Sequence, residues 1–156
     1  MAITAYNVVL AIHIMGVVIA FGVTFAYPIM FAIAAKQDPR SLPVMHRIER
    51  TIDRVLINGA LLIVLGAGLY LAAEGKDFKE FFVQWGIGAI VVIGALVGAG
   101  MIPTSKKAQE TIERDLATGD GAPSEEYRRL TRRLGIVGSL LSLLVLVSIF
   151  IMAVKP

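Results

Sequence analysis

The sequence has no cysteine and little charge: 17% of its 156 residues are charged, whereas 56% are hydrophobic. Without cysteine the chain has no disulfide, no thiolate metal site, no iron–sulfur cluster and no cysteine nucleophile. A soluble globular domain contains roughly 25% charged residues. The shortage of charge therefore excludes an ordinary soluble domain, and the short length predicts one domain, residues 1–156.

What charge there is avoids four stretches entirely: residues 8–35, 55–73, 81–102 and 134–154. A membrane-spanning helix needs roughly 20 apolar residues, and backbone in lipid must form its hydrogen bonds internally. The first stretch would be about 42 Å long as a helix, and no basic residue precedes it, which argues against a cleaved signal peptide. The sequence predicts an all-α fold, a four-helix transmembrane bundle.

The basic residues indicate how the bundle is oriented. Residues 36–54 and 103–133 contain twelve of the fifteen Lys and Arg. By the positive-inside rule these two loops are cytoplasmic and both termini lie outside. We expect a multi-pass protein of the bacterial inner (plasma) membrane. Topology and contact with anionic lipid headgroups explain the net charge of +3, so no nucleic-acid partner is expected.

Both basic loops also have helical patterns. Val44, Ile48 and Ile52 recur at helical spacing and predict an amphipathic lead-in continuous with the second span. Residues 104–116 predict another helix, residues 119–123 a break, and Ser124 the start of the helix that enters the fourth span.

Small residues four positions apart let helices approach closely in lipid. Such spacing occurs in the third and fourth spans and predicts that these two pack tightly or form an interface with a membrane-protein partner or a second copy. The pairs are Gly94 with Gly98, Gly135 with Ser139, and Gly138 with Ser142.

His13 is the ionisable residue that lies well inside a span, on the outward half of the first helix. An imidazole at this depth needs a hydrogen-bond partner, a metal or a proton path. Two interpretations follow. His13 either ligates a cofactor, with haem iron as the favoured candidate, or is a neutral histidine hydrogen-bonded to a neighbouring helix. His46, in the first basic loop, lies on the opposite side of the membrane and cannot share a metal with His13.

Other residues are expected at the depth of His13. Met152 is the best available second axial ligand, with an open sixth position as the alternative. Tyr70, Gln84 and Trp85 are candidate pocket residues, although Tyr70 and Trp85 also fit an interfacial aromatic belt. Gly16, about one turn from His13, leaves room for a flat macrocycle or for a neighbouring helix.

Short motifs give a family resemblance. The chain combines His13-Ile14-Met15-Gly16, a His-Arg-x-Glu-Arg segment over residues 46–50, and the ending Val154-Lys155-Pro156. This layout resembles a group of small four-helix bacterial membrane proteins. The group includes a predicted integral membrane family placed near CopD-like copper-resistance proteins, and the HemJ-type protoporphyrinogen oxidases. In the HemJ-type proteins a first-span histidine ligates b-type haem, and the resemblance implies that role for His13.

Two functions remain open from the sequence. The first is a small redox-linked membrane protein that binds haem b through His13, with or without enzymatic activity. The second is a non-enzymatic accessory subunit that docks on a larger membrane complex through the third and fourth spans. A bound pigment is expected for the first function and none for the second.

Overall fold

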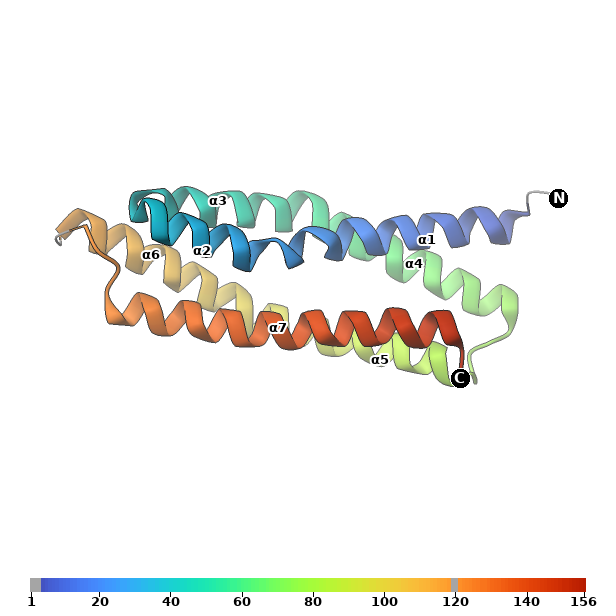
Figure 1. Cartoon of the computed structure of the whole chain (residues 1–156). Coiled ribbons are helices and arrows are strands. Elements are labelled where there is room, and N and C mark those ends of the chain that lie inside the picture. The colour runs from blue at the N-terminus through green and yellow to red at the C-terminus, as the bar shows by residue number, and fades with distance from the viewer. Residues whose placement is uncertain (1–3, 119–120) are drawn as a thin grey trace.

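The computed structural model describes residues 4–118 and 121–156. Four helical stretches are long and apolar enough to cross a membrane: Ala5–Gln37, Pro39–Gly75, Phe81–Thr118 and Glu125–Val154. Successive stretches run in opposite directions along the bundle (Figure 1). No strand is found in these two described ranges. The predicted all-α fold with four candidate transmembrane helices is confirmed.

The first stretch is two helices rather than one. Helix α1 (Ala5–Gly22) and helix α2 (Tyr27–Gln37) are separated by a 3₁₀ turn, η1 (Val23–Phe25). Pro28 occupies the first turn of α2 and has no N–H to donate back along the chain. A proline is tolerated where a helix begins but not in its interior. The single helix expected over residues 8–35 is therefore interrupted.

The second stretch contains the predicted lead-in. A 3₁₀ turn, η2 (Pro39–Ser41), precedes the amphipathic helix α3 (Leu42–Ile52). A π-helical turn, η3 (Asp53–Ile57), connects α3 to α4 (Asn58–Gly75) without a break. Helix α4 ends where Lys76 takes the left-handed conformation, with φ of 58°, a common way for a helix to stop.

The third stretch also contains a π-helical turn. Helix α5 (Phe81–Ala95) passes through η4 (Leu96–Met101) into α6 (Ile102–Thr118). Pro103 is the second residue of α6, and the missing proline N–H disturbs the α-helical hydrogen-bond pattern at the preceding turn. The helix predicted over residues 104–116 is confirmed as part of α6.

The fourth stretch is the single helix α7 (Glu125–Val154). The Ser124 hydroxyl caps it by accepting a hydrogen bond from the N–H of Tyr127. The predicted start at Ser124 is thus confirmed, whereas residues 119–120 of the predicted break lie outside the described part of the chain.

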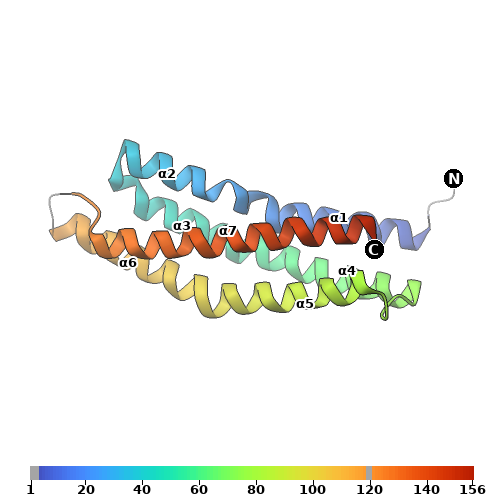
Figure 2. The same cartoon turned by 60° about the horizontal axis from the view of Figure 1, so that its bottom comes forward.

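The helices pack as two pairs, α1 on α4 and α5 on α7. The pairs meet midway along the bundle, where Phe21 of α1 packs against Ile93, Leu141 and Val145. They also meet at the end of the molecule formed by residues 36–54 and 103–133, which we call the basic end; both termini lie at the opposite end (Figure 2). The core at the basic end joins α3, α6 and α7. It is formed by Leu42, Ala108, Ile112, Tyr127 and Leu130.

The predicted packing of the third and fourth spans is found, since α5 and α6 both pack on α7, but the glycines are not its cause. A Cβ added at Gly94, Gly98 or Gly135 would meet nothing within 4 Å, so these glycines do not bring α5 and α7 together. The most extensive helix contact is instead between α1 and α4. A Cβ added at Gly16 would meet the side chains of Val64 and Ile63 there. The faces that meet therefore decide where a glycine matters, and the spacing of small residues alone does not.

Candidate functional site

His13 lies half-buried in α1 and faces α4. Its Nδ1 is 2.9 Å from the carbonyl oxygen of Val64. A carbonyl can only accept, so Nδ1 carries the proton and donates. The Nε2 atom of the neutral ring then keeps its lone pair.

The position of the His13 ring is fixed by a glycine on α4. A Cβ added at Gly68 would lie 3.1 Å from Cε1 and 3.4 Å from Nδ1 of His13. Any larger residue at position 68 would push against the imidazole. Gly68 therefore belongs to the site. Sequence reasoning did not select it, because one glycine among fifteen carries no signal of its contact with α1.

Gly16 supports the site in a different way. It is buried, and a Cβ there would lie 2.9 Å from Cγ2 of Val64, the residue whose carbonyl binds His13. The space next to Gly16 is occupied by α4. Of the two interpretations made from the sequence, the structure therefore bears out helix packing at this position.

The candidates from the third and fourth spans form a separate group on α5 and α7. The Met152 methyl packs directly over Gly86. The Trp85 indole N–H donates to the Ser148 hydroxyl over 3.0 Å, and the Trp85 ring packs near Phe81. The structure thus brings Trp85 and Met152 onto the pair opposite to the one that holds His13.

Tyr70 and Gln84 are both exposed on the protein surface. Tyr70 lies on α4 near the end that carries the termini, and 42% of its side chain is exposed. This placement fits an aromatic residue at the membrane interface.

The number of ligands that the protein can supply decides which metal groups His13 could hold. Among the described residues, no group of three or more His, Cys, Asp or Glu side chains could hold a metal ion. Haem iron differs, because the porphyrin supplies four ligands and the protein needs to supply only one or two axial ones. A single histidine with a free Nε2 meets that requirement.

A second polar group, at the basic end, was not recognised from the sequence as a unit. His46 is only 2% exposed. Its Nδ1 lies 3.3 Å from Oε2 of Glu49, and its Nε2 lies 3.1 Å from the hydroxyl of Tyr127. Ser105 donates to the same Glu49 oxygen over 3.2 Å, and the His46 ring packs against Phe31 at 4.7 Å between centroids.

This group, which we call the His46 network, connects four helices. His46 and Glu49 come from α3, Ser105 from α6, Tyr127 from α7 and the packing partner Phe31 from α2. The i, i+3 spacing of His46 and Glu49 was a usable sequence signal. The contacts with Ser105 and Tyr127 were not predictable, because they cross between spans.

Comparison with known proteins gives one match. The family described as a predicted integral membrane protein (DUF2269) matches residues 7–156. No curated protein and no solved structure matches the chain.

Proposed function

The chain belongs to the DUF2269 family of predicted integral membrane proteins, and we propose that it is a redox-linked membrane protein that binds haem b with His13 as an axial ligand. The observation that carries the proposal is the hydrogen bond from Nδ1 of His13 to the Val64 carbonyl. Ligating histidines usually donate their other ring N–H to a carbonyl or carboxylate, which fixes the tautomer and orients the ring.

Each residue around His13 has a defined part in this proposal. The Val64 carbonyl holds the proton on Nδ1 and so leaves Nε2 as the ligand atom. Gly68 allows the ring to approach α4 closely, and Gly16 allows α1 and α4 to lie together. When bound, haem supplies one-electron redox chemistry, and the chain supplies orientation and an apolar surrounding.

The second axial position is proposed to be Met152 or open. Met152 belongs to the other helix pair and packs over Gly86, and methionine has a flexible side chain with three rotatable bonds. A Met152→Leu variant separates the two cases, because loss of a thioether ligand shifts the absorbance of reduced haem, whereas an open position leaves it unchanged.

The test is an absorbance spectrum of the protein purified in mild detergent from haem-replete cells, oxidised and then reduced with dithionite. We expect a Soret band and a b-type α band, lost in His13→Ala and restored when imidazole is added to that variant. The matched control is His46→Gln, which removes the other histidine and should keep the bands.

The proposal is overturned if the folded wild-type protein is colourless and takes up no added haemin. It is equally overturned if His13→Ala keeps the same bands as the wild type. Imidazole rescue guards against misfolding, because a protein that fails to fold would not recover the bands.

The second candidate function is an accessory subunit of a larger membrane complex. The observation that favours it is the open space beside Gly94 and Gly98 on α5 and η4, since small residues at that spacing admit a partner helix. Cross-linking from cysteines placed at these two positions tests it. Retrieval of a defined partner by a colourless protein would support this function over haem binding.

The orientation is part of the proposal as well, with loops 36–54 and 103–133 in the bacterial cytoplasm. Since the chain has no cysteine, single cysteines can be introduced at Arg40 and Lys79. An impermeant maleimide should label position 79 and not position 40 in intact cells. The reverse labelling would overturn the orientation.

A further inference from the structure

A groove of about 560 Å³ lies between α6 and α7 at the basic end. Its lining combines three basic side chains with an apolar surface. The residues are Ala99, Pro103, Thr104, Lys107, Arg129, Leu130 and Arg133. This combination suits a ligand that has both a negative charge and an apolar part.

The charges in the groove are not fully neutralised. Lys107 pairs with Glu126 over 3.1 Å. In contrast, no ion pair or hydrogen bond joins the side chain of Arg129 or Arg133 to another residue in the described ranges 4–118 and 121–156. Arg129 and Arg133 are one helical turn apart on α7, so both guanidinium groups can face the same ligand. The groove therefore has excess positive charge.

The groove lies at the level where two spans leave their apolar stretches. Ala99 belongs to the uncharged stretch 81–102, and Pro103 and Thr104 follow it directly. Arg133 is the last charged residue before the uncharged stretch 134–154. The apolar lining thus borders the hydrocarbon, and the three basic groups lie at headgroup depth.

We propose that this groove is a binding site for the phosphate headgroup of an anionic phospholipid. The guanidinium groups of Arg129 and Arg133 bind the phosphate, since their planar N–H donors match its oxygens. Leu130, Ala99 and Pro103 contact the glycerol and upper acyl region. Basic grooves between transmembrane helices at the membrane surface have the chemistry that such headgroups require.

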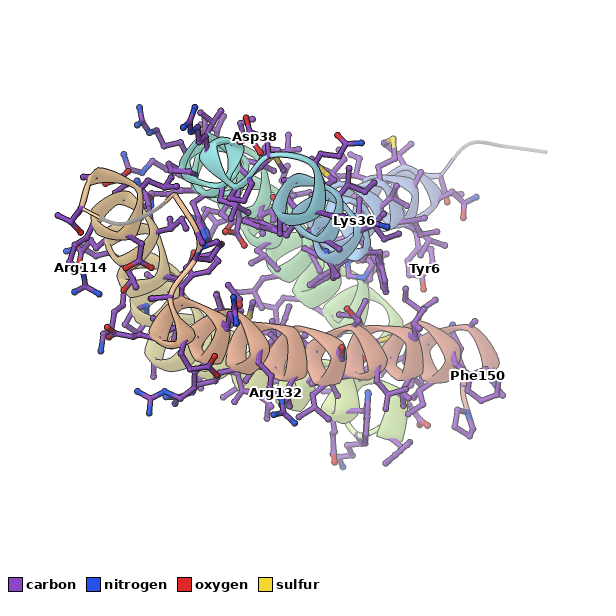
Figure 3. The ribbon with its side chains drawn as sticks, turned by 60° about the vertical axis from the view of Figure 1, so that its left-hand side comes forward. Tyr6, Lys36, Asp38, Arg114, Arg132 and Phe150 are labelled. Atoms are coloured by element: carbon purple, nitrogen blue, oxygen red, sulfur yellow. The ribbon has the colours of Figure 1, made fainter. Side chains whose placement is uncertain are left out.

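The site differs from general attraction between a basic surface and an acidic bilayer. Arg128 and Arg132 lie on the same helix with the same one-turn spacing but do not line the groove. Arg128 pairs with Glu125, and Arg132 lies on the outer side of α7, away from α2 and α3 (Figure 3). This second pair of arginines provides a control that matches the first in charge, helix and spacing.

The experiment is native mass spectrometry of the whole protein in mild detergent, with equal amounts of phosphatidylglycerol and phosphatidylcholine of the same acyl chains. We expect the wild type to retain more phosphatidylglycerol than phosphatidylcholine. Arg129→Gln with Arg133→Gln should weaken that retention by about fivefold for each arginine, since a basic group near an anionic lipid surface contributes roughly 1 kcal/mol. Arg128→Gln with Arg132→Gln should leave it unchanged.

Two further samples make the result decisive. Arg129→Lys with Arg133→Lys keeps the charge but not the planar donors, so it should retain a preference between those of the wild type and the glutamine pair, which shows that the loss is not a folding defect. Excess inorganic phosphate should not displace the lipid, because it cannot use the apolar lining. Equal loss in both glutamine pairs, displacement by inorganic phosphate, or equal retention of the two lipids would each overturn the proposal.

Discussion

The Tyr127 hydroxyl lies 3.1 Å from Nε2 of His46, although 81 positions separate the two residues in sequence. Burial and the charge of Glu49 raise the pKa of Tyr127 to about 12, so the hydroxyl remains a donor at neutral pH. The Glu49 carboxylate can only accept, so Nδ1–H of His46 donates to it, and in the neutral ring Nε2 accepts from the Tyr127 hydroxyl. The start of α7 is thereby tied to α3 within the core of the basic end.

Replacing Tyr127 with phenylalanine tests the contribution of this hydrogen bond. Tyr127→Phe keeps the ring in the core but leaves Nε2 of the buried His46 without a donor. We expect the free energy of unfolding to fall by about 1–3 kcal/mol, the usual cost of an unsatisfied buried polar group. Denaturant unfolding in mild detergent, followed by circular dichroism, measures the change.

Tyr70→Phe is the matched control, since Tyr70 is 42% exposed. Its unfolding midpoint should equal that of the wild type. Equal midpoints for all three proteins would show that the His46 network does not stabilise the fold.

Adding one methyl group at Gly68 tests the position of the His13 ring. A Cβ there would lie 3.1 Å from Cε1 of His13, so Gly68→Ala should shift the imidazole by a few tenths of an ångström and disturb its hydrogen bond to Val64. If His13 ligates haem, we expect lower haem occupancy or a shifted α band in the reduced spectrum.

Gly66→Ala is the control for this substitution, because it makes the same change on the same helix where no atom lies within 4 Å. It should leave the spectrum unchanged. Identical spectra of both alanine variants and the wild type would contradict a role for Gly68 in orienting His13.

The four spans were predictable because charged residues are costly in lipid, so each span appears in the sequence as a long stretch without charge. Local signals likewise located the lead-in that became α3 and the cap at Ser124. The interruption of the first span before Pro28 was missed, although proline gives a local signal. The pairing of α1 with α4 was not predictable, since Gly16 and Gly68 differ from the other glycines only by what faces them.

One residue of the candidate site was predictable as well, because polar groups are also costly in lipid. His13 was recognisable because an imidazole within a span is costly. Its partner is the backbone carbonyl of Val64, and every residue has a carbonyl, so no sequence pattern marks that position. Met152 was placed by depth alone, and depth does not specify which helix a side chain packs on; the structure puts it over Gly86.

A larger residue at Gly16 should force α1 away from α4. In Gly16→Leu the new side chain would meet Val64 at its first carbon, with 2.9 Å between Cβ and Cγ2. We expect a loss of about 1–3 kcal/mol in the free energy of unfolding, as for other overpacked sites. Gly22→Leu, at a position with open space on the same helix, should cost far less. Equal effects of the two substitutions would argue against close packing at Gly16.

The contact between Asp115 on α6 and Ser124 at the start of α7 should weaken in acid. Asp115 accepts a hydrogen bond from the N–H of Ser124 over 2.9 Å. Hydrogen bonds from Ser124, together with the charge of Arg114, hold the pKa of the Asp115 carboxyl below its usual value. A group whose pKa is lower in the folded state stabilises the protein above its unfolded pKa of about 4 and loses that contribution as the pH falls through the folded value.

Asp115→Asn should therefore be less stable than the wild type above about pH 5, and the difference should shrink as the pH falls below about 4. Unfolding midpoints of both proteins from pH 6 to pH 3 measure this. Taking the difference between the two proteins removes the effect of other carboxyls, including Glu126, whose pKa is also lowered, by Arg114 and Lys107. A difference that stays constant across the range would mean that the charge of Asp115 does not contribute to holding the start of α7 against α6.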